Sequence, residues 1–483
     1  MSAHAANPHH ARRWAILAVL GLAQLMVVLD GTVVNIALPS AQADLGFSDA
    51  DRQWIITAYT LAFGSLLLFG GRLADVMGRK SVLLIGLIGF SIASAVGGAA
   101  PSFEVLVIAR GAQGLFGALL APAALSTLTT TFTDPNERGK AFGIYGAIAG
   151  AGAAIGLILG GFLTEYLSWR WCLYVNLILA VPAAIAAFAL LVNQRPEGKA
   201  RLDLLGTVVV SVGLLGIVYG CSKAQSDGWT APITLGLLIG GLALVALFVL
   251  IETRISNPLL PMRVVLDRGR AGAYIGLGLA CVGMFGVFLF LTFYLQTILM
   301  YSPIKTGFAF LPMVGAIMVM ATTSTAVLLP RIGARIPVVL GMVLAAIGMV
   351  ILTQIGVGAA YATHVLPGLV VMGLGMGLLF ATCFEVGTSG VQAHDAGIAS
   401  AMANTTQQVG GSIGTALLST IATTVAANYV ASGLGDPVQA AVHSYSVAFW
   451  VSAGIFAGAA VICGLLIPGG KHDREQMAAP AAI

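Results

Sequence analysis

Apolar stretches of about twenty residues recur along almost the whole chain, separated by short polar connections. Each stretch is long enough to cross a bilayer core of about 30 Å as an α-helix. Fourteen membrane helices are therefore predicted, at residues 14–38, 52–72, 81–99, 105–128, 139–164, 170–192, 203–222, 233–253, 271–298, 307–329, 336–356, 364–388, 398–427 and 444–467. The short alternating strands of a membrane β-barrel are absent, so we expect an all-α membrane protein.

The composition supports insertion into the lipid bilayer. Hydrophobic residues make up 58% of the chain and charged residues only 9%, with a mean hydropathy of +0.96. Soluble domains carry about 25% charged residues. The net charge of +4 gives no reason to expect a nucleic-acid partner. The five cysteines have no paired spacing, so we expect neither a metal site nor a disulfide framework.

Lysines and arginines are distributed unevenly between the two sides of the predicted helices. With a cytoplasmic N-terminus, eighteen of the 23 fall on cytoplasmic segments, four on outer segments and Arg110 within a helix. Cytoplasmic loops of membrane proteins are enriched in Lys and Arg. We therefore expect a multi-pass protein of the cell membrane with both termini in the cytoplasm.

Three pairs of identical residues at similar separations suggest an internal repeat in the chain. Ser48 and Ser302, Gly78 and Gly333, and Gly139 and Gly397 recur at a separation of 254 to 258 residues. A nearly constant separation predicts two six-helix halves in parallel orientation. The halves are residues 14–192 and 271–467, the segment 193–270 carries an inserted helix pair, and 468–483 is a cytoplasmic tail. Coincidence among 61 glycines is the alternative explanation.

Asp30 is the only ionisable residue between Trp14 and Leu38. A charge at membrane depth is costly, so such a group usually faces a cavity or a partner. Asp30 is therefore the first candidate for a proton-binding group. Arg110, which also lies inside a predicted helix, needs a partner for the same reason and is the candidate counter-ion.

Glu385 is the second acidic residue that falls clearly inside a predicted helix, near its cytoplasmic end. Intramembrane acids are rare and often functional, which makes Glu385 a candidate second proton or cation site. The alternative is an interfacial side chain that pairs with a loop arginine such as Arg331.

The loop after the second predicted helix reads Gly71-Arg72-Leu73-Ala74-Asp75-Val76-Met77-Gly78-Arg79-Lys80. This segment resembles the signature loop of the major facilitator superfamily. Gly71 allows close approach of helices, Asp75 is able to accept from N–H groups at a helix N-terminus, and the basic residues hold the loop at the cytoplasmic face. We interpret Gly71, Asp75, Gly78, Arg79 and Lys80 as a conformational latch between the two halves.

Together with the sequence LDGTVVNIALP at residues 29–39, this loop resembles the fourteen-helix drug:proton antiporter branch, the EmrB/QacA-like proteins. The resemblance implies the major facilitator fold. It also implies a role in proton coupling for Arg110, which is followed by Gln113 and Gly114 as in the family's arginine motif. Residues 168–176 and 397–414 resemble the same branch, although Ile178 stands where the branch usually has proline.

Gly152, Gly156, Gly160 and Gly161 resemble the antiporter motif that marks exporters. The family usually has proline after the second of these glycines, whereas this chain has Leu157, which leaves import open as an alternative. Glycine-rich helices are more often packing surfaces than sites, because small residues let helix backbones approach. We therefore predict that these glycines mainly pack helices.

Several aromatic and amide side chains fall at helical spacings that would present one face to a substrate cavity. Aromatic faces bind flat lipophilic cations, but aromatic residues are also ordinary packing residues of helix bundles. The candidate lining residues are Asn35, Tyr59, Phe63, Gln113, Phe285, Phe288, Tyr294, Gln296, Asn404 and Gln407.

The sequence contains no nucleotide-binding loop of the Walker type and no catalytic or metal-ligating arrangement. We expect a transporter that works as a monomer by alternating access, with a proton gradient as its energy source and no cofactor. The leading hypothesis is an antiporter that exports lipophilic, cationic drugs or other amphipathic compounds. The alternatives are a transporter specialised for one metabolite, lipid or self-made antibiotic, and a receptor that binds a ligand without moving it.

Overall fold

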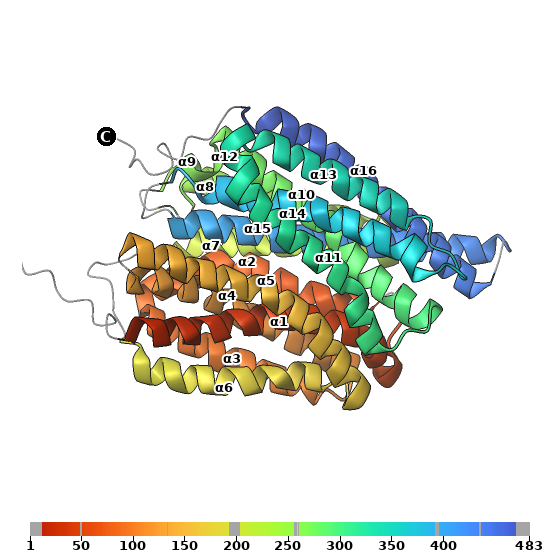
Figure 1. The fold of residues 1–483 in the computed structure, drawn as a ribbon, viewed down its shortest axis with the longest axis horizontal. Helices are drawn as coiled ribbons and strands as arrows, with labels where there is room; N and C mark the ends of the chain where they lie inside the picture. The colour runs from red at the N-terminus through yellow and green to blue at the C-terminus, as the bar shows by residue number, and fades with distance from the viewer. Residues whose placement is uncertain are drawn as a thin grey trace, which may run out of the picture.

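A computed structural model describes residues 12–48, 51–132, 134–192, 203–255, 258, 260–391, 396–433 and 436–469. Within these residues the secondary structure is helical, and no strand occurs. The long helices run side by side in one elongated bundle (Figure 1). The predicted all-α class is therefore confirmed.

The first six helices form one group, drawn from red to yellow in Figure 1. They are α1 (Arg13–Leu45), α2 (Gln53–Met77), α3 (Arg79–Gly98), α4 (Phe103–Thr131), α5 (Pro135–Tyr166) and α6 (Trp171–Leu190). Helix α4 packs against α2 and α3, while α1 packs against α5 and α6. We call these six helices the N-terminal bundle.

The next two long helices, α7 (Leu204–Asp227) and α8 (Pro232–Glu252), pack against each other. The short helix α9 (Met262–Val265) follows and leads to the remaining helices. Helix α7 also packs against α2 and against α15 (Ala396–Ala431), so it contacts helices from both ends of the chain.

The remaining helices form a second group, which we call the C-terminal bundle (Figure 1). It contains α10 (Arg268–Phe293), α11 (Pro303–Thr323), α12 (Leu329–Ile332), α13 (Arg335–Leu352), α14 (Leu366–Thr388), α15 and α16 (Pro437–Leu466). Three π-helical turns interrupt or extend these helices: η2 (Tyr294–Ile298), η3 (Ser324–Leu328) and η4 (Tyr361–Val365).

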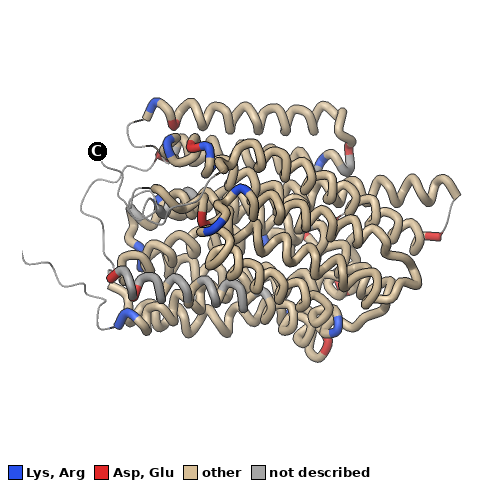
Figure 2. The backbone as a smooth tube through the Cα atoms, turned by 45° about the horizontal axis from the view of Figure 1, so that its top comes forward, with Lys and Arg blue, Asp and Glu red and all other residues tan. Residues whose placement is uncertain are grey.

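A long helix occupies each of the fourteen ranges that the hydropathy pattern predicts. Among the described residues, eleven helices are long and apolar enough to cross a membrane. Helices α2, α5 and α7 have shorter apolar segments, at Gln53–Leu67, Ala154–Tyr166 and Leu205–Cys221. The number of fourteen spans therefore stays a prediction. Charged residues gather near the helix ends (Figure 2), as expected for helices that cross a bilayer.

The two bundles touch directly at the end where α1 and α5 end and α11 begins. A Cβ atom on Gly161 would lie 2.5 Å from the Cα of Ile304, so only glycine allows α5 to approach α11 this closely. In the same region Gln296 Nε2 donates to the carbonyl of Ile36 at 3.0 Å. Nearer the middle of the bundles, the hydroxyls of Thr60 and Ser412 lie 2.6 Å apart. The arrangement therefore brings α1, α2 and α5 against helices of the other half.

Candidate polar site inside the N-terminal bundle

Asp30 lies near the middle of α1, and its side chain is fully buried. Its carboxylate accepts three hydrogen bonds. Oδ2 accepts from Arg110 Nη1 at 2.6 Å, and Oδ1 accepts from Gln113 Nε2 at 2.9 Å and Asn176 Nδ2 at 2.7 Å. Because an ionised carboxylate only accepts, three donors around it fit the charged form.

Arg110 on α4 is 2% exposed and makes its hydrogen bonds within the bundle. Besides the ion pair with Asp30, its Nη1 donates to Gln113 Oε1 at 2.8 Å and its Nε donates to the carbonyl of Ile55 at 3.1 Å. The guanidinium carbon lies 4.4 Å from the ring centre of Tyr59 on α2, in cation–π contact. The predicted pairing of Asp30 with Arg110 is therefore present in the structure.

A second layer of polar side chains orients the amides. Ser94 on α3 accepts from Gln113 Nε2 at 2.7 Å and from Asn176 Nδ2 at 3.3 Å. Ser94, Gln113 and Asn176 are each fully buried. We call Asp30, Ser94, Arg110, Gln113 and Asn176 the polar cluster. A buried network of this kind holds the ion pair in one geometry, because the loss of any one hydrogen bond to the Asp30 carboxylate leaves part of its negative charge without a partner.

The polar cluster lies inside the N-terminal bundle, because its side chains come from α1, α3, α4 and α6. All the hydrogen-bond partners of Asp30 belong to its own half, so in this conformation the carboxylate faces a partner rather than a cavity. Gln113, predicted as a cavity residue, likewise belongs to the polar cluster.

A small pocket approaches the polar cluster from the end where α1 ends. Its wall runs from Ala41 and Trp169, close to helix ends, to Val34 and Arg110, which lie deeper in the bundle. Most of the wall is apolar, and Arg110 is the charged group on it. Trp169 donates from Nε1 to Asp44 Oδ2 at 2.9 Å, which ties α1 to the start of α6 beside the pocket.

The predicted latch residues lie at the junction of α2 and α3. Gly78 has φ of 89° and ends α2, a conformation that favours glycine. Gly71, Arg79 and Lys80 are partly exposed, and Lys80 Nζ donates to the carbonyl of Phe188 at 2.8 Å. Asp75 belongs to α2, but its side chain lies outside the described part of the structure. The latch role stays a prediction.

The four glycines of α5 do pack helices. A Cβ on Gly156 would collide with the side chain of Thr32, and one on Gly160 would lie 2.9 Å from the carbonyl oxygen of Val33, both on α1. Gly152 also faces α1, whereas Gly161 faces α11. Helix α5 therefore connects the helix that carries Asp30 with the C-terminal bundle.

Glu385 lies three residues before the end of α14, and its side chain is exposed. It belongs to the C-terminal bundle and takes no part in the polar cluster. The structure thus separates the two acids that the sequence proposed for proton coupling. A role for Glu385 stays a prediction.

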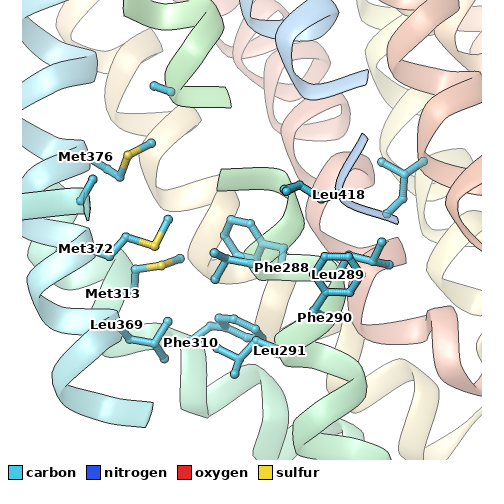
Figure 3. Packing of buried hydrophobic residues seen from close by; sticks show 14 of the residues in the cluster. Phe288, Leu289, Phe290, Leu291, Phe310, Met313, Leu369, Met372, Met376 and Leu418 are labelled. Carbon is cyan, nitrogen blue, oxygen red and sulfur yellow. The ribbon is translucent and has the colours of Figure 1, made fainter. Parts of the chain in front are cut away.

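Two of the predicted cavity residues lie in the core of the C-terminal bundle. Phe288 packs against Phe310 at 5.3 Å between ring centres, beside methionines of α11 and α14 (Figure 3). Tyr294 is fully buried and donates from its hydroxyl to the carbonyl of Gly356 at 2.8 Å. Both side chains are buried in a large apolar cluster, which fits the packing alternative, and a role on a cavity wall stays a prediction.

The other predicted cavity residues are spread over both bundles. Tyr59 and Phe63 stack on each other with ring centres 5.7 Å apart, and both are buried. The amides of three residues donate to backbone carbonyls of their own helices: Asn35 to Gly31, Asn404 to Ser400 and Gln407 to Ala403. Gln296 contacts α1, as described above, and the side chain of Phe285 lies outside the described part. The structure does not gather these residues into one site.

Sequence reasoning missed Ser94 and Asn176 as site residues. Asn176 follows the motif Ser-Trp-Arg-Trp and stands alone in an apolar run, which is the same signal that singled out Asp30. Ser94 carries no such signal, because serine is common on packing faces of membrane helices.

Comparison with known proteins decides the family. The sequence profile of the Major Facilitator Superfamily matches residues 20–415. The chain belongs to this superfamily. It is therefore a multi-pass membrane transporter and not an enzyme, as the resemblance implied.

Characterised relatives cover nearly the whole chain. The puromycin resistance protein pur8 of Streptomyces alboniger is 49% identical over 96% of this chain and 93% of its own length. The cephamycin export protein CmcT of Amycolatopsis lactamdurans is 37% identical over 92% and 90%. The tetracenomycin C resistance and export protein of Streptomyces glaucescens is 33% identical over 88% and 77%.

Solved structures of transporters share the fold. The transporter PepTSo of the POT family aligns with a TM-score of 0.71 and 15% identity over 94% of this chain and 97% of its own. A bacterial homologue of the human lysosomal transporter Spinster aligns with a TM-score of 0.66 and 16% identity over 97% and 99%. The major facilitator fold is thereby confirmed.

Proposed function

We propose that this superfamily member is a proton-coupled antiporter that exports lipophilic, cationic antibiotics or other amphipathic compounds across the cell membrane. The observation that carries the proposal is the fully buried ion pair of Asp30 and Arg110 inside a transport bundle. A structural ion pair alone is expensive to keep there, because both charges lose their hydration. Uptake and release of a proton by Asp30 during transport would explain why the protein retains a buried ion pair with this desolvation cost.

Proton uptake by Asp30 changes the polar cluster in a defined way. A protonated carboxyl group has fewer accepting positions and one O–H that must donate. Arg110, Gln113 and Asn176 each donate one hydrogen bond to Asp30, and at least one of these three donors then has to turn away. Arg110 keeps the carbonyl of Ile55 and Gln113 Oε1 as acceptors, so neutralisation of Asp30 favours a shift of Arg110 along α4, away from α1.

The packing of α1 carries such a shift to the contact between the halves. Gly156 lets α5 lie against Thr32 and the carbonyl of Leu29, directly beside Asp30. Farther along α5, Gly161 lies against Ile304 of α11. A displacement of α1 therefore moves the helix that touches the opposite half. Rocking of one half against the other is how such transporters alternate access.

In this proposal the proton reaches Asp30 by way of the small pocket beside Trp169. The pocket wall extends from Arg110 toward the end of the bundle at which α1 ends, which we predict to face outward. A proton gradient directed inward then loads Asp30 from the outside. In this mechanism the protein needs no cofactor and acts as a monomer, and both termini stay in the cytoplasm.

The names of the relatives support antibiotic export. They describe resistance to puromycin, export of cephamycin, and resistance to and export of tetracenomycin C. Each name contains one compound, which favours a second candidate, a transporter specialised for a single antibiotic. Puromycin is the first compound to test, because that relative is 49% identical to this chain.

The test uses purified protein in proteoliposomes with a proton gradient of controlled direction. Wild-type protein is expected to move puromycin only when the gradient is present and to move protons in the opposite direction. Asp30→Asn is expected to abolish both movements. Glu137→Gln is the matched control, because it removes an acid from a partly exposed ion pair with Arg13 and leaves the polar cluster intact.

Transport assays with a panel of unrelated amphipathic cations distinguish the two candidate functions. Transport of several compounds supports the multidrug exporter, and transport of one supports the specialised exporter. Full proton-coupled transport by Asp30→Asn contradicts the role of Asp30. Binding of a compound without any transport points to a receptor instead.

A further inference from the structure

The inserted helix pair carries two acids that the proposed mechanism does not use. Asp203 precedes α7 and caps it, since its Oδ1 accepts from the N–H of Gly206 at 2.9 Å. Glu252 is the last residue of α8 and is only 3% exposed. Because α7 and α8 are antiparallel and packed together, these two residues lie at the same end of the pair.

The two carboxyl groups face each other. Glu252 Oε2 accepts from the N–H of Leu260 at 2.7 Å, but its Oε1 has no hydrogen-bond partner among the described residues. Asp203 Oδ2 is also buried without such a partner. A Cβ atom built on Gly206 would contact both of these oxygens, at 2.9 Å for Glu252 Oε1, so both lie beside Gly206. The carboxyl groups are within hydrogen-bonding reach of each other.

Among the described residues, Arg72 near the end of α2 is the charged group that acts on Glu252 besides Asp203. Its Nη2 donates to the carbonyl of Pro258 at 2.7 Å. Phe248 on α8 and Leu260, whose N–H binds Glu252, belong to one buried apolar cluster. Two ionised carboxylates in contact at a buried site repel each other strongly, whereas one proton between them satisfies both orphan oxygens.

A metal ion fits this pair less well than a proton. Cations such as Ca²⁺ and Mg²⁺ take six or more oxygen ligands in proteins or from water. The described residues contain no group of three or more acidic, histidine or cysteine side chains that would hold one. Because Glu252 Oε2 accepts from the N–H of Leu260, Oε1 and Asp203 Oδ2 are the two buried oxygens left without a partner among the described residues, too few for such a cation.

We propose that Asp203 and Glu252 form a proton-binding site that shares one proton between Oδ2 and Oε1. The site holds the connection between α8 and the C-terminal bundle. Glu252 binds this connection at Leu260, and Arg72 of the second helix binds it two residues earlier, at Pro258. Loss of the shared proton separates the carboxylates, and Glu252 then pulls away from Asp203 together with the connection. The inserted pair thereby makes the attachment of the C-terminal bundle dependent on pH.

The test is infrared difference spectroscopy of the full-length protein in lipid nanodiscs as the pH is raised. All samples carry Asp30→Asn, so that the polar cluster contributes no carboxyl signal. The parent protein is expected to show the C=O stretching band of a protonated carboxyl group, which disappears as the pH rises. In Asp203→Asn and in Glu252→Gln the remaining carboxylate gains an amide donor in place of the proton. Both variants are therefore expected to lack the band.

Asparagine still caps a helix, so Asp203→Asn keeps the start of α7 and tests the proton rather than the fold. Glu104→Gln, a change of an exposed acid at the start of α4, is the control and is expected to retain the band. A band that persists unchanged in both Asp203→Asn and Glu252→Gln overturns the proposal. So does a band that is absent from the parent protein, or one that disappears only when Mg²⁺ or Ca²⁺ is added. The spectra require no substrate, so they are independent of the test of antibiotic transport.

Discussion

The ion pair of Asp30 and Arg110 makes a quantitative prediction about stability. Both side chains are almost completely buried, at 0% and 2% exposed, and the N–O distance is 2.6 Å. Removing one partner of such a pair leaves an uncompensated charge and costs about 3–5 kcal/mol of unfolding free energy. We therefore expect Asp30→Asn and Arg110→Met each to lose this amount.

The double variant distinguishes the free energy of the interaction between Asp30 and Arg110 from that of the contacts each makes with other residues. Replacing both charges of a buried ion pair is often neutral or even stabilising by about 1–4 kcal/mol, because the desolvation penalty also disappears. The amide oxygen that Asp30→Asn introduces still accepts from Gln113 and Asn176, so the amide network remains connected. We expect the double variant to be more stable than either single variant.

The assay uses the five cysteines, all of which are buried. A thiol reagent reaches them when the protein opens, so labelling against denaturant in mixed micelles reports unfolding. Glu137→Gln is the comparison, because its ion pair with Arg13 is partly exposed and is expected to contribute only about 0–1 kcal/mol. If the losses of unfolding free energy in the two single variants simply add in the double variant, the two charges do not interact. That result refutes the reasoning.

Two further predictions concern the polar cluster and the contact between the halves. Asn176→Ala removes a donor to a buried carboxylate and is expected to cost about 1.5–3 kcal/mol in the same labelling assay, whereas an unchanged midpoint contradicts the hydrogen bond at 2.7 Å. Gly161→Ala forces α5 away from Ile304 and is expected to cost about 1–3 kcal/mol and to slow transport. Gly454→Ala is its control, since a Cβ there meets nothing within 4 Å, and equal effects of the two changes argue against the packing explanation.

The sequence predicted the helices because hydropathy is a local property. A run of apolar residues forms a helix in a bilayer whatever its neighbours are, since its backbone groups must bond to each other. All fourteen predicted ranges hold long helices for this reason. The pairing of Asp30 with Arg110 followed from the same physics, because each charge needs a partner and the apolar surroundings offer few.

The sequence could not place the aromatic residues. Phe288 and Tyr294 fall at spacings that fit a cavity wall as well as a core, and the rotation of α10 and of the π-helical turn η2 that follows it decides between them. That rotation depends on the shapes of neighbouring helices such as α14, which no single segment encodes. Helical spacing fixes which face of the helix a residue occupies but not what that face meets.

The sequence by itself thus determined which segments are helical and that Asp30 is a costly charge in need of a counter-ion. Only the tertiary structure decided where that charge points. It brought Asn176, 146 residues away, onto the same carboxylate. It directed the side chains of the polar cluster toward the interior of the N-terminal bundle rather than toward the other half. It also placed Asp203 against Glu252, two acids that look like ordinary interfacial residues at separate helix ends. The physical reason is that the energy of a buried charge depends on the few groups within contact distance, and packing between distant helices selects them.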